Sequence, residues 1–315
     1  MNKKELKEFI HALSALGERQ FQKETKACEL IEKWLKREGI PYAKEKFKTY
    51  LPRFQEVKLT ADGKEIPCAG SSFVSGVIEG TNHLISSLTS SQNFLYTDNI
   101  NFNPACNGVS RSNHYFAPSL AIPKKYVPVV CSAKKVFGSV KVEKKAHESA
   151  NILVGNRKNP NYLVFSHYDS ISTGAIDNAS GTALSLHLAT NHKELLKKAL
   201  FVFCGNEELS YDKGKYWGHG YRVFEKKHYK ILLQAKKILI LDCVGYSATN
   251  FIQDSNVVVL GFPIKNMRRL MKKTYLVIGD MQALMKVYHS DLDTPGLIKM
   301  PELMRAAKKV RDRLP

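Results

Sequence analysis

The stretch YLVFSHYDSISTGAIDNASG, residues 162–181, joins a short apolar run to a polar loop bounded by glycines. Its first four residues are typical of a strand that is buried on both faces. His167 and Asp169 follow this run at once, and Asp177 comes after them among small residues. Polar turns seldom carry this mix directly after a buried strand, so the stretch raises the question of a metal site.

The sequence around this stretch alternates between apolar runs and amphipathic segments, which predicts an α/β fold. A chain of this kind forms a mostly parallel, mixed sheet flanked by helices. Functional groups in such sheets gather at the carboxyl ends of the strands. The expected strands are residues 150–155, 161–167, 199–205, 236–245 and 256–261, and the expected helices are residues 181–198, 220–235, 264–275 and 299–314.

The N-terminal part of the chain begins with two segments of helical periodicity and a strand. The helices are expected at residues 3–16 and 21–38, and the strand at residues 45–50. These elements have the same character as the α/β region further along the chain. We therefore assign residues 1–50 and 141–315 to one catalytic α/β domain.

Residues 51–140 differ in character and predict a small β-rich insertion. A hairpin is expected with Asp62 and Gly63 at its turn, because this dipeptide favours the tight turns of hairpins. Residues 125–132 and 139–145 are also typical of strands, since they are rich in valine.

Composition excludes several classes of protein. The 315 residues are 43% apolar and 24% charged, which is ordinary for a soluble globular protein. The sequence has no apolar run of the roughly 18 residues that a membrane helix needs, and its N-terminal segment has no apolar core of a signal peptide. We expect a cytoplasmic protein without a membrane partner, unless a leader peptide precedes these residues, which would make the protein secreted.

The formal net charge of +19 does not by itself indicate a nucleic-acid partner. The lysines are spread along the whole chain, and the sequence contains no RNA-binding signature or arginine-rich tract. Solubility, or attraction to acidic substrates, accounts for this charge. We therefore expect no nucleic-acid partner.

The six cysteines contain no CxxC pair, so a zinc ribbon is not expected. Without a secretion signal, reduced thiols are expected. Cys204 and Cys243 lie in apolar runs and are interpreted as small buried hydrophobic residues.

Acidic groups and imidazoles follow three of the expected strands. His167 follows the first strand, Glu207 and Glu208 follow the next, and Asp242 follows a third. Each residue alone has an ordinary explanation as a turn or cap residue. Carboxylates gathered at one edge of a sheet repel each other, however, and a divalent cation offsets that repulsion.

The types of ligand indicate which cation would fit. The segment VYHSDLDTP adds His289 to the carboxylates and to His167, and we expect no thiolate ligand. This set suits Zn²⁺, with Mn²⁺ or Co²⁺ as possible occupants. Two ions a few ångströms apart would need a bridging carboxylate. One residue of Glu207-Glu208 can then bind metal while the other acts as a base.

The ordered motifs resemble those of the M28 family of di-zinc aminopeptidases. The resemblance covers about 130 residues, and the eight-residue piece GAIDNASG is its most specific part. The motifs are H-x-D at 167–169, GAIDNASG at 174–181, the pair 207–208, Asp242, and H-x-x-x-D-T at 289–294. The family has a phosphorylase/hydrolase-like zinc exopeptidase fold, which the resemblance implies for this chain.

The resemblance also implies a role for each residue of these motifs, and it implies two bound Zn²⁺ ions. Glu207 would be the general base on an activated water, and Asp169 would orient His167. The bond between Asp177 and Asn178 is often cis in the family. The implied metal ligands are Asp177 as the bridge, His167 and Asp242 on one ion, and Glu208 and His289 on the other.

The activity that the resemblance implies is removal of N-terminal residues from peptides with a free N-terminus. Some family members carry a protease-associated domain at the place of residues 51–140, although an unrelated β-rich lid would also fit there. The loop after Glu208 is longer than usual in the family and carries Tyr211, Tyr216 and Trp217, which either shape a specificity pocket or pack the loop. The preferred side chain and the oligomeric state stay open.

Three other activities remain as alternatives. A glutaminyl-cyclase-like acyltransferase shares the fold and usually works with one zinc ion. A carboxypeptidase for acidic substrates and a catalytically inactive peptide-binding relative are the other two. The complete set of expected ligands, together with Glu207, favours an active enzyme.

Overall fold

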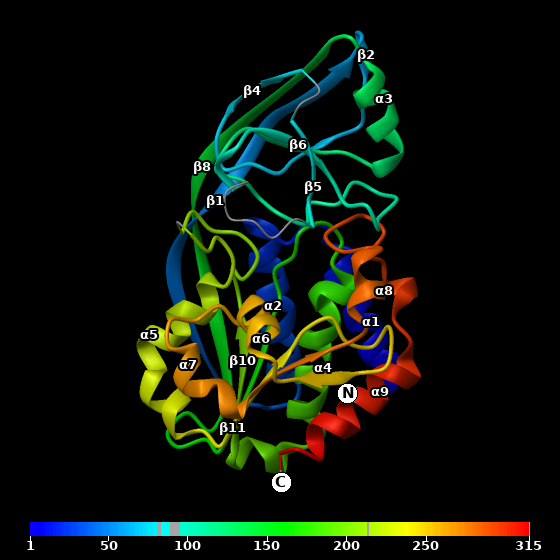
Figure 1. Cartoon of the computed structure of the whole chain (residues 1–315). Coiled ribbons are helices and arrows are strands. Elements are labelled where there is room, and N and C mark those ends of the chain that lie inside the picture. The colour runs from blue at the N-terminus through cyan, green and yellow to red at the C-terminus, as the bar shows by residue number, and fades with distance from the viewer. Residues whose placement is uncertain (81–82, 89–94, 213, 315) are drawn as a thin grey trace. The chain divides into compact units, whose positions relative to one another are not determined.

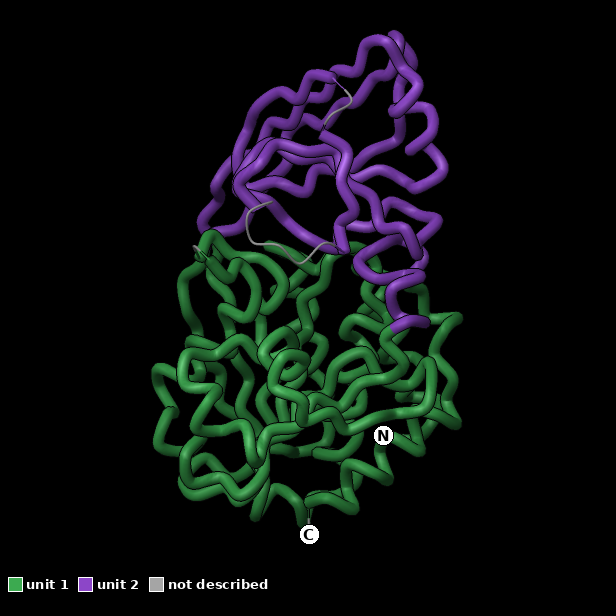
Figure 2. The backbone as a smooth tube through the Cα atoms, in the orientation of Figure 1, with its two compact units in different colours: residues 1–49, 147–281, 293–315 green, residues 50–146, 282–292 purple. Residues whose placement is uncertain are grey.

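The structure is a computed structural model that describes residues 1–80, 83–88, 95–212 and 214–314. It divides into two compact units (Figure 2). Unit 1 comprises residues 1–49, 147–281 and 293–315, and unit 2 comprises residues 50–146 and 282–292. Unit 2 contains the expected insertion, residues 51–140, together with short segments on either side and a later segment that was expected in the α/β domain.

The sheet of unit 1 is mostly parallel, as predicted. Strand β9 lies between β10 and β11, and it is parallel to both (Figure 1). Strand β13 pairs in parallel with β11, while β8 and β12 pair antiparallel at either side of this parallel group. The strands are β8 (Val136–Gly155, from His147 onward in unit 1), β9 (Tyr162–His167), β10 (Ala199–Cys204), β11 (Lys237–Leu241), β12 (Asn250–Ile252) and β13 (Thr274–Ile278).

Helices cover both faces of this sheet. On one face, alternate strand residues such as Val164 and Phe201 pack in one core with apolar residues of helices α1, α2, α4 and α9. On the other face, Phe165 contacts the rings of Phe224 in α5 and of Phe262 just after α6. The helices of unit 1 include α1 (Lys3–Ser14), α2 (Gln22–Arg37), α4 (Gly181–Asn191), α5 (His219–Gln234), α6 (Ser255–Gly261), α7 (Met267–Leu270) and α9 (Met300–Arg311).

Strands β9, β10 and β11 are almost completely buried, which explains why they are apolar except at the ends of β9 and β11. A strand with helices on both faces cannot alternate apolar and polar residues, because both sets of side chains lie in the core. Their carboxyl ends lie at one edge of the sheet, since the three strands are parallel. The fold therefore brings together whatever side chains follow these strands.

Unit 2 is β-rich, with the predicted hairpin at its start. Strand β1 pairs antiparallel with β2, and Asp62 and Gly63 form the turn with positive φ at both residues. A second sheet has the order β3-β7-β6-β5. The strands are β1 (Tyr42–Ala61, from Tyr50 onward in unit 2), β2 (Lys64–Glu65), β3 (Ala69–Gly70), β4 (Gly76–Glu79), β5 (Leu84–Ser86), β6 (Asn99–Phe102) and β7 (Ser119–Ala121).

The core of unit 2 lies among its strands and one helix. Leu59, Ile78, Leu120 and Val130 are buried together there. The helix is α3 (Val127–Ser132), and α8 (Met281–Met285) ends in the later segment of this unit. Whether unit 2 is a protease-associated domain stays a prediction.

Two segments predicted as strands are helical. Residues 125–132 end in helix α3, where Pro128 lies in the first turn and needs no N–H donor. Residues 256–261 lie in α6, where Asp254 caps the N-terminus by accepting hydrogen bonds from the backbone of Asn256 and Val257. A proline in the first turn of α3 and a side-chain cap on α6 thus override the strand preference of valine.

The segment 264–275 was predicted as one helix, and it contains a short helix, a 3-10 turn at Met271–Lys273 and the start of a strand. Helix α7 covers only Met267–Leu270, and strand β13 already begins at Thr274. The buried residues of β13 extend the parallel sheet beyond β11. No helix that the structure describes combines the length and the apolar character needed to cross a membrane.

Candidate metal centre

The carboxyl ends of β9, β10 and β11 carry the acidic and imidazole groups that the sequence singled out. His167 is the last residue of β9, and Asp242 follows β11 directly. Glu207 and Glu208 lie shortly after the end of β10. Because β9 is the middle strand, His167 stands between the two groups of carboxylates.

His167 contacts two of the predicted ligands. Its Nε2 atom lies 3.3 Å from Asp177 Oδ1 and 3.6 Å from Asp242 Oδ1. Two ligands at about 2.0–2.2 Å from a zinc ion and at tetrahedral angles lie about 3.3–3.6 Å apart. Each of the two carboxylates is therefore at ligand spacing from the His167 imidazole, and the residue types fit zinc.

Asp177 belongs to two separate groups of potential metal ligands. One group is His167, Asp177 and Glu208, and the other is Asp177, Asp242 and Cys243. In each group, one donor atom from every residue lies within 4.8 Å of the others. A carboxylate that is shared by two donor groups is what a bridging ligand requires.

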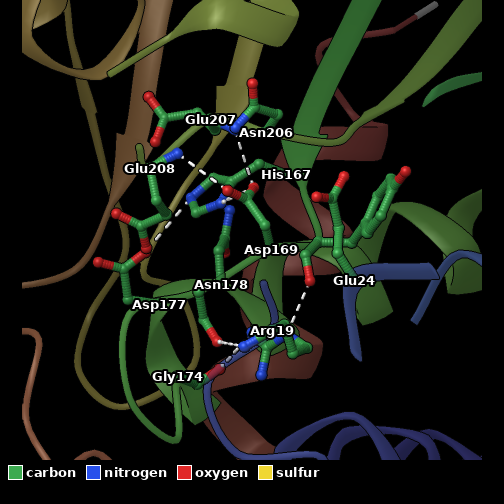
Figure 3. Close-up of polar contacts among 12 residues, drawn as sticks. Arg19, Glu24, His167, Asp169, Gly174, Asp177, Asn178, Asn206, Glu207 and Glu208 are labelled. Atoms are coloured by element: carbon green, nitrogen blue, oxygen red, sulfur yellow. Dashed lines mark hydrogen bonds and ion pairs between the residues drawn. The ribbon is translucent and has the colours of Figure 1, made fainter. Parts of the chain in front are cut away.

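Asp169 holds the pair of glutamates through its carboxylate (Figure 3). The backbone N–H of Glu207 donates to Asp169 Oδ1 at 3.0 Å, and that of Glu208 donates to Oδ2 at 2.9 Å. Asp169 Oδ1 also lies 3.4 Å from His167 Nδ1. Asp169 thus fixes the turn after β10 and contacts the imidazole, which supports its predicted role as a supporting residue.

The surroundings of Glu207 make its carboxylate more basic than that of an ordinary glutamate. Burial raises the pKa of Glu207 well above its usual value, and the charges of Glu208, Asp169 and Asp242 act in the same direction. Burial alone would lower the pKa of His167, but Asp169, Asp177 and Asp242 raise it well above its usual value. A bound cation would lower both values, because it stabilises the deprotonated forms.

The turn that carries Asp177 is an irregular helical turn, Ala175–Ser180, with a cis bond between Asp177 and Asn178. This confirms the cis bond implied by the family resemblance. The side chain of Asn178 donates to Leu241 O at 2.8 Å, which ties the turn to the end of β11. Gly174 begins the turn with φ +56°, and a Cβ atom there would overlap the backbone oxygen of Asp177.

Arg19 is a residue of this region that the sequence did not reveal. It is fully buried, and its guanidinium donates to the backbone oxygens of Tyr168, Thr173 and Gly174 at 2.7, 2.9 and 2.9 Å (Figure 3). Burial lowers the pKa of Arg19 to about 10, whereas nearby carboxylates, Asp169 first among them, raise it. Arg19 therefore stays charged and holds the loop between His167 and Asp177.

Asp293 binds backbone N–H groups of the same loop. Its carboxylate accepts hydrogen bonds from Ile176 N at 2.7 Å and from Asp177 N at 3.0 Å. Burial raises the pKa of Asp293 to about 7, although these two hydrogen bonds lower it. The sequence showed Asp293 as part of the family motif, but spacing alone did not reveal this contact.

His289 lies in unit 2, whereas the other predicted ligands lie in unit 1. Within unit 2 it is buried, its Nδ1 atom lies 3.1 Å from Arg111 O, and its ring stacks on Tyr288. Its backbone has φ 51°. That His289 is a ligand of the second ion stays a prediction.

The aromatic residues of the loop after Glu208 pack within unit 1. Tyr216 is buried and its ring contacts Trp217 at 5.1 Å. Trp217 Nε1 donates to Leu260 O at 2.8 Å. These contacts support the packing interpretation for Tyr216 and Trp217, and they leave side-chain preference open.

One comparison concerns the sequence that encloses this site. Residues 150–259 match peptidase family M28. This segment carries every residue of the two donor groups. The part of the chain that holds the cluster is therefore similar to peptidase family M28. A search of curated proteins gives no match.

Solved structures of zinc aminopeptidases are similar in fold to this chain. BSAP, a zinc aminopeptidase from Bacillus subtilis, aligns with a TM-score of 0.70 and 20% identity over 98% of this chain and 93% of that one. An aminopeptidase from Aneurinibacillus sp. strain AM-1 gives 0.64 and 18%, over 97% and 91%. Glutaminyl cyclase from Porphyromonas gingivalis gives 0.53 and 13%, over 99% and 97%. At these identities the likeness concerns the fold.

The predicted α/β fold with a mostly parallel sheet is thus confirmed, as is the resemblance to family M28. The family match and the cluster of potential ligands together support a metal-dependent peptidase. The six cysteines, all of which the structure describes, form no disulfide, and Cys204 and Cys243 are buried as expected. Cys243 is nevertheless more than a packing residue, since it belongs to a donor group.

Proposed function

We propose that the chain is a zinc-dependent aminopeptidase that hydrolyses the N-terminal residue from peptides. The observation that carries this proposal is the position of Asp177 in two donor groups, one of which contains Glu208, the residue that follows Glu207. His167, Asp177, Glu208 and Asp242 would hold two ions, with His289 as the further ligand predicted from sequence. The similarity in fold to BSAP and to the Aneurinibacillus aminopeptidase also supports it.

The chemistry follows from the side chains present. Bound zinc ions would lower the pKa of a water molecule and polarise the scissile carbonyl. Glu207 would take the proton from that water and deliver it to the leaving amine. Its carboxylate is buried and its backbone is held by Asp169, so the base has a fixed position. Glu208 is left to bind metal.

Activity on defined peptides tests the proposal. We expect release of free N-terminal amino acids from peptides with a free amino group, and none from the same peptides after N-acetylation. A panel of aminoacyl chromogenic substrates would then give the preferred side chain. Removal of metal with a chelator should abolish activity, and zinc should restore it. Hydrolysis that starts from the C-terminus would instead support the carboxypeptidase.

Substitution of the proposed base separates catalysis from metal binding. Glu207→Gln should keep the metal content of the parent protein and lose about 10²- to 10⁴-fold in kcat, the usual contribution of a general base. Glu225→Gln is a matched control, because Glu225 is also buried in unit 1 but holds the backbone of Lys265 and Asn266. Full activity of Glu207→Gln would remove Glu207 as the base.

Metal content separates the proposal from the cyclase that shares the fold. About two equivalents of zinc with peptide hydrolysis support the aminopeptidase. About one equivalent with cyclisation of N-terminal glutamine supports the acyltransferase. Metal binding without either activity would indicate a peptide-binding relative. His289→Ala tests the unit 2 residue in the same assay, since loss of about one equivalent is expected if it binds the second ion.

A further inference from the structure

Cys243 has an unusual place at the carboxyl end of β11. It is the second residue after the strand and follows Asp242 directly. Its side chain is 2% exposed, and its backbone has φ 51°, in the left-handed region that L-residues seldom adopt. Its Sγ atom lies 3.2 Å from Asp242 Oδ1. A strained backbone here aims a sulfur atom at a carboxylate.

The backbone of Cys243 is fixed from two directions. Its N–H donates to Asn178 Oδ1 at 3.3 Å, and its carbonyl accepts from Gly279 N at 3.0 Å. Asn178 is the residue after the proposed bridging ligand, so the same amide side chain ties Cys243 to Asp177. The thiol thus has a defined position relative to both carboxylates.

We propose that Cys243 is a thiolate ligand of the ion that Asp177 and Asp242 hold. This rests on the proposed function, because it requires the metal centre. The geometry supports it, since one donor atom each of Asp177, Asp242 and Cys243 lies within 4.8 Å of the others. On ligation the Sγ–H bond breaks, the proton passes to solvent, and the sulfur lone pair forms the bond to the ion.

This ligand has a consequence for the choice of metal. Thiolate is a soft ligand that favours zinc over manganese, whereas carboxylate and water suit manganese. The purely oxygen and nitrogen set that the sequence suggested leaves these ions in competition. With Cys243, the position on Asp177 and Asp242 becomes selective for zinc.

The ligand also makes the two metal positions unequal. The group of Asp177, Asp242 and Cys243 contains a thiol, whereas the group of His167, Asp177 and Glu208 contains none. The position beside Glu208, which Glu207 adjoins in sequence, would then keep a purely oxygen and nitrogen ligand set.

Cys204 provides a comparison within the same unit. It is the last residue of β10, it is fully buried, and it also lies at the carboxyl edge of the sheet. In the part of the chain that the structure describes, it belongs to neither donor group. Both cysteines are therefore buried near a strand end. They differ because Cys243 lies in a donor group with two carboxylates and Cys204 does not.

Cobalt binding to the full chain tests the proposal without any assay of activity. Metal-free protein is titrated with Co²⁺, which gives visible bands in any protein site and an intense near-ultraviolet charge-transfer band when a thiolate is bound. We expect this charge-transfer band in the parent protein. It should disappear in Cys243→Ala and persist in Cys204→Ala.

The possible outcomes distinguish the two proposals. Visible cobalt bands without the charge-transfer band would overturn the role of Cys243 and leave the metal centre intact. A charge-transfer band that persists in Cys243→Ala would also overturn it, since another thiol would be the ligand. If no stoichiometric cobalt binds, the metal centre of the proposed function fails, and the role of Cys243 fails with it.

Two further measurements guard against misfolding of the variant. Zinc K-edge X-ray absorption of the unsubstituted zinc protein should show a sulfur neighbour, at an average of about half a sulfur atom per zinc if both positions hold zinc, and the absence of sulfur would contradict the proposal. Competition with a chelator should show that Cys243→Ala loses at least about tenfold in zinc affinity, the lower bound for groups that only support a ligand. Manganese affinity should change much less, and equal losses for both ions would contradict selectivity through the thiolate.

Discussion

Replacement of Arg19 tests how the loop between His167 and Asp177 is held. Arg19 is fully buried and forms three short hydrogen bonds to backbone oxygens of that loop. Arg19→Met keeps much of the volume and removes both the charge and all five donors. Arg19→Lys keeps the charge and loses the planar fork that reaches three acceptors.

The magnitude follows from the contacts that are lost. A hydrogen bond from a charged donor contributes about 1.5–3 kcal/mol, but the three bonds share one side chain and are not additive. Breaking a buried charged network by removing one partner typically costs about 3–5 kcal/mol. We expect Arg19→Met to lower the free energy of unfolding by about 4 kcal/mol, and Arg19→Lys by about 2–3 kcal/mol, because lysine can still reach one or two oxygens.

Urea denaturation of the metal-free protein measures this effect, because bound metal would add its own stabilisation. Thermal unfolding should show a loss of about 8–16 °C for Arg19→Met in a domain of this size. Arg222→Met is the matched control: Arg222 also donates to backbone oxygens of a loop, but its side chain is 14% exposed. A loss for Arg19→Met no greater than that for Arg222→Met would refute the reasoning.

Metal affinity shows whether Arg19 acts through position or through charge. If Arg19 acted through charge alone, Arg19→Met would tighten metal binding, because a positive group near the cation site is removed. We expect weaker binding in Arg19→Met, since the loop that carries Asp177 loses its anchor. Tighter binding in that variant would show that the charge dominates.

Three further substitutions probe other features of unit 1. Hydrogen bonds from His219 and Arg222 lower the pKa of Asp212 from 3.8 to about 2, so its stabilisation is present above pH 4 and is lost as the pH falls towards 2. Asp212→Asn, at a partly exposed site, should cost about 1 kcal/mol in urea denaturation at pH 7 and about half of that at pH 3; equal costs at both would contradict the shift. Asp254→Ala should lower stability by about 1 kcal/mol through loss of the α6 cap, and an unchanged urea midpoint would contradict that role. Gly205→Ala should cost about 1–3 kcal/mol, because the new Cβ would overlap the Glu24 carboxylate, and parental thermal stability would exclude this overlap.

The sequence predicts the strand-end part of the site well, for a physical reason. Buried parallel strands are apolar throughout, so polar residues such as His167 and Asp242 mark the points where the strands end. The topology of parallel sheets then brings these ends together, although they are far apart along the chain. Periodicity alone thus located the edge of the sheet, and the family motif assigned the roles.

The same reasoning failed where a local cap or a distant contact decides the structure. Residues 125–132 and 256–261 are rich in valine, yet Pro128 and Asp254 start helices there. Arg19 has no spacing signal at all, because its partners lie 149 to 155 residues away in sequence. No pattern within a short window of sequence reports a contact of that kind.

The structure also sharpens the argument from charge repulsion that first indicated a metal. Asp169 and Asp293 each accept hydrogen bonds from two backbone N–H groups, so both carboxylates have partners within the protein. Arg19 lies close to them, and its charge also acts on Glu208 and Asp177. Asp177 and the carboxylates that share its two donor groups are grouped instead with His167 and Cys243, the two side chains with a soft or borderline donor atom. Carboxylates held by backbone N–H groups and carboxylates grouped with such donors are thus separate sets, which is why the cluster fits zinc better than a harder cation.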